Sequence, residues 1–459
     1  MPHDALAQIL QAAGAEAPRP GEVEIRGADP VFATRYRVGT AGAASLAALG
    51  LAAARLWQAR GGRAQRIAVD VAAAASSLRS TAYLRIDDKP LKEMWDALSG
   101  FYPVSDGWIR FHCNFPLHRD AAYGVLGVAQ ERKAGEAASG GWAGEALESA
   151  IHAAGGCAGY VRSGVDWTRH AQAQAIAEQP LIAIDRIGDA PPEPLPEAPR
   201  PLSGVRVLDL TRVLAGPTCA RSLAEHGADV LKISAAHLAD SGAVEIDTGI
   251  GKLSARLDLR KQEDVRALRE LLRQADVFSQ SYRPGALAAR GFAPEALAAL
   301  RPGIVCVSLS AWGTSGPWRE RRGFDSIVQS VSGLAQASAG KDGKPRLLPV
   351  SAIDYVSGYL MAFGALLALE RRAREGGSWR VRVALARVGK WITDLGEAGP
   401  HGADELPPEV LQNLLMQTAA PGGRITHLRP VLEMSQTPPR WDRPPVPLGY
   451  HPPAWPPRG

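Results

Sequence analysis

Two stretches of the chain share one pattern of hydrophobic and polar positions. From Thr40 to Ala72 an alanine- and leucine-rich run leads to glycine and then to alternating valine and isoleucine, and the pattern recurs 314 residues later, from Asp354 to Ala386. The later copy has the same residue at the positions of Leu46, Ala48, Gly50, Ala54, Arg60, Gly62, Arg66 and Val69. In both copies the pattern predicts a helix, a glycine stop and a short strand. Only the later copy begins with a carboxylate, which indicates a duplicated fold with one functional site.

Apolar runs and helical patterns alternate through the second half of the chain. Short apolar runs predict strands at 205–210, 229–233, 277–280 and 304–309, and helical periodicity predicts helices at 218–225 and 261–274. This order predicts an α/β fold, with a Rossmann-like parallel sheet wrapped by helices and ligands at the carboxyl ends of the strands.

Proline-rich composition marks the boundaries. The stretch Gly188–Pro201 is typical of a stiff linker, and a second proline-rich stretch closes the chain. We expect a partial copy of the large-domain helix and strand at 1–89, a small α/β domain at 90–187, the linker at 188–201, the Rossmann-like domain at 202–395 and a proline-rich C-terminal tail at 396–459.

Bulk composition is that of an ordinary soluble globular protein, at 459 residues, 46% hydrophobic and 22% charged. The net charge of +5 comes from dispersed arginines, so a solvated surface explains it and no nucleic-acid partner is expected. Four scattered cysteines predict neither a disulfide framework nor a metal site. The run Ala41–Ala54 is too short to span a bilayer, and no secretory signal is visible. We expect a cytoplasmic protein without membrane partners.

Several common catalytic motifs are missing from the sequence. The turn after the first strand, Thr211–Pro217, is not GxGxxG, and there is no GxxxxGK[ST], HExxH or GxSxG. Dinucleotide, P-loop, zinc-protease and hydrolase chemistry are therefore disfavoured.

Six blocks in series resemble the family III CoA-transferases, which include formyl-CoA and carnitine CoA-transferases and the α-methylacyl-CoA racemases. The blocks are LSGVRVLDLTRVLAGP (202–217), GADVLKI (227–233), GKLSARLDL (251–259), SYRPGALAARG (281–291), SLSAWGTSGPWRERRGFDSIVQSVSG (308–333) and AIDYVSGYLMAFGALLALERR (352–372). The resemblance implies that fold and a CoA-transferase activity, with acyl-CoA and a carboxylic acid as substrates and no prosthetic group.

The resemblance places Asp354 at the position of the family's catalytic aspartate. A carboxylate there can attack the acyl donor and carry CoA as an aspartyl thioester. The predicted helix would place Asp354 at a helix N-terminus, where backbone N–H groups hold anions. On local sequence alone, Asp354 could instead be only the N-cap of this helix.

Three further segments match the family's CoA contacts. The resemblance implies that Arg212, Val213 and Leu214 pack on the adenine, that Lys252 approaches the CoA phosphates, and that Tyr282 and Arg283 also line the CoA site. The chain departs from the family at Ser281-Tyr282, where Asn-Phe is usual, and at Ser234, where an acidic residue is common.

Two alternative functions remain open. The chain could be a catalytically silent CoA-binding protein or partner subunit. It could also be a 2-methylacyl-CoA racemase, but members of that branch use a histidine where this chain has Phe324, and phenylalanine cannot move a proton.

The front half resembles the later part of a second family copy, with Thr40 at the aspartate position. Residues 107–119 and 153–163 resemble the family's small domain, so we infer that this domain serves the active site of the back half. Two independently packed pieces of a fusion are the alternative. Family members form interlocked homodimers, which implies either such a dimer here or a pseudo-dimer within one chain.

Overall fold

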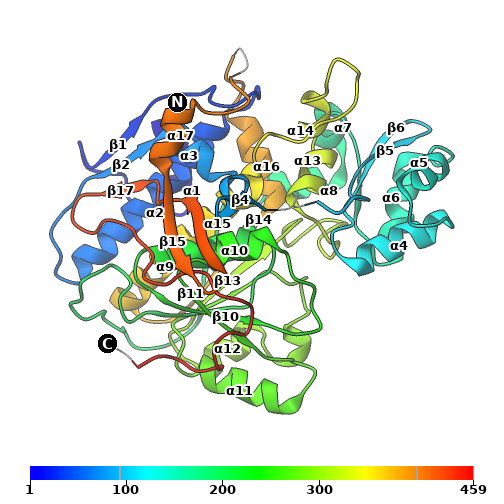
Figure 1. The fold of residues 1–459 in the computed structure, drawn as a ribbon. Coiled ribbons are helices and arrows are strands. Elements are labelled where there is room, and N and C mark those ends of the chain that lie inside the picture. Colours follow the sequence, from blue (N-terminus) through cyan, green and yellow to red (C-terminus); the bar gives the residue numbers. More distant parts are fainter. Residues whose placement is uncertain (92–94, 400–401, 458–459) are drawn as a thin grey trace.

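The computed structural model describes residues 1–91, 95–399 and 402–457. Its largest sheet has seven strands in the order β11-β10-β9-β12-β13-β14-β8 (Figure 1). The bounds are β8 (Ala183–Gly188), β9 (Arg206–Asp209), β10 (Asp229–Ser234), β11 (Lys252–Arg256), β12 (Val277–Gln280), β13 (Val305–Ser310) and β14 (Ser378–Ala384). Neighbouring strands are parallel except β8, which pairs antiparallel with β14. The Rossmann-like parallel sheet predicted from the sequence is confirmed.

Helices cover this sheet. They are α9 (Ala215–Glu225), α11 (Gln262–Leu272), α12 (Pro294–Leu300), α15 (Ala352–Glu375) and α16 (Leu385–Asp394). The same part of the chain also forms α10 (Ala243–Gly249), η2 (Ala288–Arg290), α13 (Asp325–Val331) and α14 (Leu334–Ala337). The long helix α15 packs against α9, β13 and β14, and it is buried along most of its length.

The repeated segment takes the same secondary structure twice. The first copy forms α2 (Val38–Ala59), β2 (Ile67–Asp70) and α3 (Val71–Ser77), and α15, β14 and α16 follow in the same order in the second copy. The two glycines shared by the long helices have one structural role. A Cβ on Gly50 would lie 2.9 Å from Ile67 Cγ2, and a Cβ on Gly364 would lie 2.5 Å from Val381 Cγ1. In each copy the glycine lets the helix approach the strand that follows it.

The helices α2 and α15 pack directly against each other, so the two copies share one core (Figure 1). Against α2 pack α1 (Pro2–Ala12) and β1 (Val23–Arg26), while η1 (Ser80–Tyr83) contacts α10. Both α2 and α15 are long and apolar enough to cross a membrane by length and composition, but 94% and 100% of their most apolar windows are buried in the fold. Such burial is typical of core helices.

A separate small domain follows, seen in cyan in Figure 1. Its three-stranded antiparallel sheet carries helices on one side and has its own core around Tyr102, Phe111 and Ile151. Its elements are β5 (Gly100–Val104), β6 (Gly107–Phe111), α4 (Pro116–Leu126), α5 (Arg132–Ser139), α6 (Gly144–Ala153), β7 (Ala158–Tyr160), α7 (Gly164–Arg169) and α8 (Ala171–Ala177). The boundary expected at 187 needs correction, because β8 pairs with β14 and extends the large sheet.

The expectation of a simple tail from residue 396 is wrong. Residues 408–434 form α17 (Pro408–Leu414), β15 (Leu415–Ala420), β16 (Gly423–Leu428) and β17 (Leu432–Met434). β15 and β16 form a hairpin that joins β3 (Arg85–Ile86) and β4 (Lys89–Pro90), while β17 pairs with β2. Residues 408–434 therefore form strands because β2 and β3 of the front half pair with them. The sequence of residues 408–434 alone does not indicate these partners.

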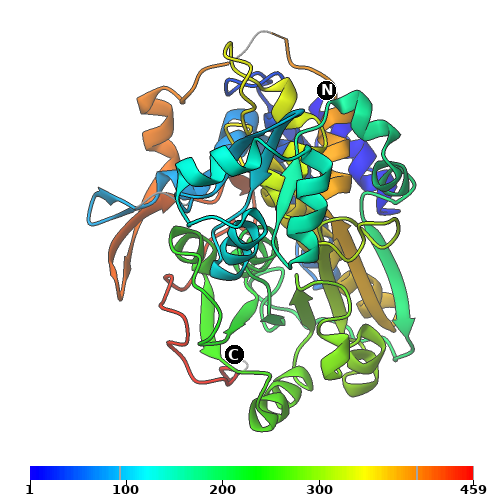
Figure 2. The same cartoon turned by 90° about the vertical axis from the view of Figure 1, so that its right-hand side faces the viewer.

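The last proline-rich stretch does run in extended form over the large domain (Figure 2). Trp441 Nε1 donates to the Arg221 carbonyl at 3.2 Å, the His451 N–H to the Ser254 carbonyl at 2.7 Å, and Trp455 Nε1 to the Leu271 carbonyl at 3.0 Å. These contacts fix the stretch along α9, β11 and α11.

Candidate active site

Asp354 lies in the first turn of α15 and is 9% exposed. Ser351 is the N-cap residue, so the alternative in which Asp354 serves only as the cap is wrong. Among the residues that the structure describes, none donates a hydrogen bond to the Asp354 carboxylate. The carboxylate is buried at the positive end of a long helix and forms no ion pair with the described residues, so it is available for chemistry.

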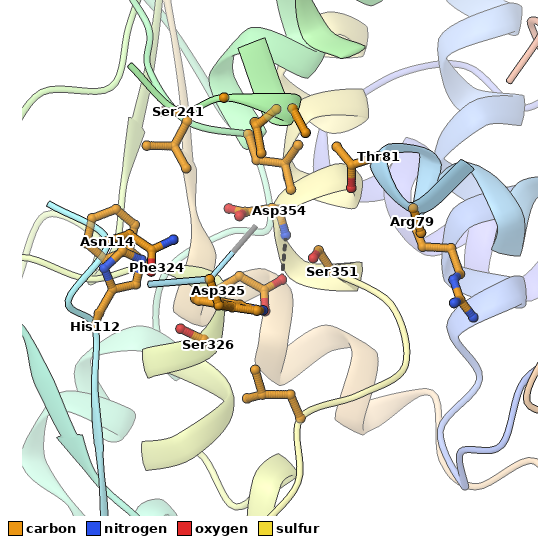
Figure 3. Close-up of a pocket in the computed structure, with 18 of the residues that line it drawn as sticks. Arg79, Thr81, His112, Asn114, Ser241, Phe324, Asp325, Ser326, Ser351 and Asp354 are labelled. Atoms are coloured by element: carbon orange, nitrogen blue, oxygen red, sulfur yellow. Dashed lines mark hydrogen bonds between the residues drawn. The ribbon is translucent and has the colours of Figure 1, made fainter. Parts of the chain in front are cut away.

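A second carboxylate supports the backbone at this turn. Asp325, the first residue of α13, accepts a hydrogen bond from the Asp354 N–H at 3.0 Å and another from the Gln329 side chain (Figure 3). Burial raises the pKa of Asp354 well above its ordinary value, and the charge of Asp325 raises it further. Burial also raises the pKa of Asp325 to about 6. Two acids in one desolvated site disfavour each other's ionisation, which is common in catalytic sites.

Two cavities meet at Asp354. The larger cavity, about 770 Å³, lies between the small domain, α10 and the loop before α15. The arginine-lined cavity, about 590 Å³, lies at the carboxyl ends of β9, β12 and β13. Both are lined by Phe115, Val213, Leu214, Phe324 and Asp354. A group held at this junction can contact ligands in both cavities.

The arginine-lined cavity collects most of the residues predicted to contact CoA. Its walls include Arg212, Val213, Leu214, Tyr282 and Arg283, together with Asp354. Arg321 and Arg322 add two more guanidinium groups. Four arginines around one cavity favour a polyanionic ligand.

The loop after β9 is strained at the junction. Val213 has a φ of 68°, a left-handed conformation that β-branched residues rarely adopt. Ser281 supports this loop by accepting a hydrogen bond from the Arg212 N–H at 3.2 Å. Strained backbone of this kind is concentrated at functional sites, because the surrounding structure must stabilise it.

Residues 202–413 match the profile of CoA-transferase family III. This segment belongs to that family. Relatives with similar sequences include the acetyl-coenzyme A transferase nodX of Hypoxylon pulicicidum, 35% identical over 204 residues, which are 43% of this chain and 34% of the relative. The succinyl-CoA–D-citramalate CoA-transferase of Chloroflexus aurantiacus is 34% identical over 190 residues, covering 39% of this chain and 47% of its own. The mouse succinyl-CoA:glutarate CoA-transferase is 35% identical over 190 residues, which cover 39% of this chain and 43% of the relative.

The chain therefore spans about half or less of the length of these relatives. Among solved structures, Rv3272 from Mycobacterium tuberculosis is similar, at 31% identity over 43% of this chain and 58% of that one, with a TM-score of 0.40.

Within the family III segment, Lys252 does not lie where the sequence suggested. It is 1% exposed, and its Nζ donates to Asp209 Oδ2 and to the Pro217 carbonyl, both at 2.8 Å. It lines neither the larger nor the arginine-lined cavity. The expectation that Lys252 approaches the CoA phosphates is corrected: a buried ammonium needs a charged partner, and Asp209 takes that place.

The small domain supplies an imidazole that the sequence did not reveal. Phe324 stands at the position of the racemase histidine, and His112 stacks on its ring with centroids 3.7 Å apart. His112 lines the larger cavity, and burial lowers its pKa well below the ordinary value, so it is neutral. His118, in the wall of the arginine-lined cavity, has a pKa lowered to about 4 by burial. No local pattern links residues 112 and 324.

The front half of the chain thus forms part of the site's walls. Trp95, Asn114 and Phe115 come from the small domain, and Arg79 and Thr81 come from the segment around η1 (Figure 3). The two halves are therefore not two independently packed pieces. The sequence missed Asp325 and Ser326 as site residues, although both lie in one of the blocks that resemble the family.

Proposed function

We propose that the chain is a CoA-transferase that moves CoA from an acyl-CoA to an acceptor carboxylate through a covalent intermediate on Asp354. The observation that carries this proposal is the position of the Asp354 carboxylate at the junction of two cavities. One cavity is lined by four arginines and the other largely by neutral groups. A thioester lying across the junction would present its carbonyl carbon to Asp354.

The chemistry needs only groups that the site and the substrates supply. An Asp354 oxygen attacks the thioester carbonyl, the C–S bond breaks, and a mixed anhydride and CoA thiolate form. The thiolate then attacks the aspartyl carbonyl, which releases the donor acid and leaves an aspartyl-CoA thioester. An acceptor carboxylate oxygen attacks the aspartyl carbonyl, the C–S bond breaks, and a second mixed anhydride and CoA thiolate form. The thiolate attacks the acceptor's carbonyl, and the C–O bond to Asp354 breaks, which gives the acceptor's CoA thioester and the Asp354 carboxylate.

The arginine-lined cavity is suited to hold CoA during these steps. Arg212, Arg283, Arg321 and Arg322 line it, and guanidinium groups bind phosphates through charge-assisted hydrogen bonds. The Arg212 guanidinium lies over the Phe115 ring, 5.2 Å from its centroid, which orders it beside the junction. The thiol end of a CoA bound here would reach Asp354.

Trapping tests the proposal directly. The protein is incubated with an acyl-CoA and hydroxylamine, digested, and examined by mass spectrometry for a hydroxamate on the peptide that contains Asp354. We expect the hydroxamate in the native protein and none in Asp354→Asn. Asp189→Asn is the matched control, because its side chain is 97% exposed and lies outside both cavities. No hydroxamate and no transfer, with CoA still bound, would contradict catalysis and favour a CoA-binding protein.

One observation favours a second candidate, racemisation of a 2-methylacyl-CoA. The neutral imidazole of His112 borders the same cavity as Asp354, and this pair of groups can exchange an α-proton. We rank it second because Phe324 occupies the family's histidine position. The reaction would incorporate solvent deuterium at the α-carbon of a 2-methylacyl-CoA, and we expect none. Incorporation that is lost in His112→Phe would reverse the ranking.

A further inference from the structure

The two cavities that meet at Asp354 differ in charge. The described lining of the arginine-lined cavity has four arginines and a single carboxylate, Asp354. The described lining of the larger cavity has one arginine, Arg79, and four carboxylates: Asp96, Asp240, Asp325 and Asp354. Asp96 is paired with Arg119, whose Nη1 lies 3.5 Å from Asp96 Oδ2. Asp240 and the Asp325–Asp354 pair are the acidic groups that remain in the described lining.

The Arg79 charge is already compensated. Its Nη2 donates to Glu405 Oε1 at 2.6 Å, and its Nη1 donates to the Asp404 carbonyl at 3.2 Å. Figure 3 shows the side chain extending away from Asp354. A ligand carboxylate in the cavity would have to compete with Glu405 for this guanidinium.

Among the described residues, another cation lies behind the wall. Arg110 is 5% exposed and stacks over Trp95, with its guanidinium carbon 4.7 Å from the ring centroid, and over Phe101 at 5.0 Å. Trp95 is part of the lining, whereas Arg110 is not. The Arg110 guanidinium therefore cannot contact a ligand in this cavity directly.

The remaining walls offer aromatic surface and neutral polar atoms. Trp95, His112, Phe115 and Phe324 form aromatic surface on the small-domain side. Ser326 is 2% exposed and lines the cavity, and its Oγ has no hydrogen-bond partner among the described residues. The same holds for Nδ1 of His112, which is 3% exposed. Buried polar atoms usually have partners, so these two atoms can form hydrogen bonds with a polar group on the ligand.

We propose that the larger cavity selects an uncharged acyl group and disfavours a second carboxylate. This inference rests on the proposed function, which assigns the cavity to the acyl group. A terminal carboxylate would lose its hydration there, find no free cation among the described lining residues, and lie near Asp96 and Asp240. A terminal amide or methyl group of the same size would avoid these costs.

A matched set of ligands tests the proposal. Glutaryl-CoA, its terminal-amide analogue and pentanoyl-CoA differ only at the far end of the acyl group. Their dissociation constants are measured calorimetrically with Asp354→Asn protein, which cannot form the anhydride. We expect the amide and pentanoyl thioesters to bind at least tenfold more tightly than glutaryl-CoA. In the native protein, transfer to the monoamide of glutarate should exceed transfer to glutarate by a similar factor in kcat/KM.

Charge removal supplies the second test. In the double variant Asp96→Asn/Asp240→Asn the preference against glutaryl-CoA should shrink at least threefold, while Asp189→Asn should leave it unchanged. Equal or tighter binding of glutaryl-CoA would overturn the inference. Rapid transfer of CoA to glutarate would also overturn the inference, but it would support the proposed function. If none of the three thioesters binds, both the inference and the proposed function are wrong.

Discussion

The Asp354 N–H donates to the carboxylate of Asp325 at 3.0 Å, and this bond joins the first turns of α15 and α13. It holds the candidate nucleophile in place while placing a second acid beside it. The front half contains a related arrangement: the Gly39 and Thr40 N–H groups donate to Asp29 at 3.0 and 2.6 Å. Both copies thus fix the start of the long helix with an aspartate from another segment, and only one copy adds a carboxylate on the helix itself.

Replacing Asp325 should change the pH dependence of transfer. Asp354 must be ionised to attack, and both burial and the Asp325 charge raise its pKa. Asp325→Asn removes the charge while retaining an oxygen that can accept the Asp354 N–H, so the pKa of Asp354 should fall. We expect the acid limb of the kcat/KM profile to move to lower pH, by about one unit. A lower rate at every pH with an unmoved limb would mean that Asp325 has a purely structural role.

Lys252 and Arg283 should respond differently to substitution. Lys252→Met leaves Asp209 buried without its cation, so the free energy of unfolding should fall by about 3–5 kcal/mol. Arg283 is exposed beside the arginine-lined cavity, so Arg283→Ala should leave stability within about 0.5 kcal/mol and weaken CoA binding about tenfold. Urea denaturation and calorimetry measure these effects.

The double variant Lys252→Met/Asp209→Leu is the control for the buried pair. It should recover part of the lost stability, because it leaves no unpaired charge. If Lys252→Met instead weakened CoA binding at unchanged stability, the placement of Lys252 away from CoA would be contradicted.

Local patterns in the sequence were enough to predict the strands and helices of the parallel sheet and to single out Asp354 as the candidate nucleophile. Each depends on a periodic or contiguous signal, such as the apolar run of β12 or the block that contains Asp354. Relationships across long sequence separations were not predicted. His112 meets Phe324, and the β15–β16 hairpin meets β3, only because distant segments fold together. Lys252 was misplaced for a related reason: its sequence neighbours do not reveal that Asp209 lies within 2.8 Å.

His226 should make the protein less stable in acid. It is fully buried at the end of α9, neither ring nitrogen has a partner among the described residues, and burial lowers its pKa to about 3. The unfolded chain takes up a proton near pH 6.5, whereas the folded chain keeps the ring neutral. The contribution of neutral His226 to the free energy of unfolding is therefore fully present above pH 6.5, and it is lost as pH falls from 6.5 towards 3.

His226→Leu should remove this loss. Between pH 7.5 and pH 5 the free energy of unfolding should decrease by about 2 kcal/mol less in the variant than in the native protein. Burial raises the pKa of Glu225 to about 7, so protonated Glu225 adds stability below pH 4.5 that is lost as pH rises to 7. The free energy of unfolding therefore changes with pH in the opposite sense, with an opposite slope. That slope is common to both proteins, so the comparison isolates His226. Urea titrations at the two pH values give the difference, and the exposed His3→Leu variant should not change it. Parallel pH curves for the native protein and His226→Leu would contradict this account.

Installing the missing acid in the first copy should not create a second site. Thr40 is 2% exposed, its N–H is bonded to Asp29, and it lines neither of the two cavities that meet at Asp354. An aspartate there would reproduce the Asp325–Asp354 pair without a place for CoA. We expect Thr40→Asp in the Asp354→Asn background to give no transfer and no trapped hydroxamate.

The same substitution should destabilise the fold in a pH-dependent way. A carboxylate buried beside Asp29 has its pKa raised, so stability is lost as pH rises through that pKa. At pH 8 the loss should be about 1–3 kcal/mol, and it should diminish at pH 5. Thr40→Asn, which has the same shape without the charge, should lose less and show no such slope. Transfer activity in Thr40→Asp/Asp354→Asn would mean that the first copy retains a CoA site and that the chain has two copies able to function.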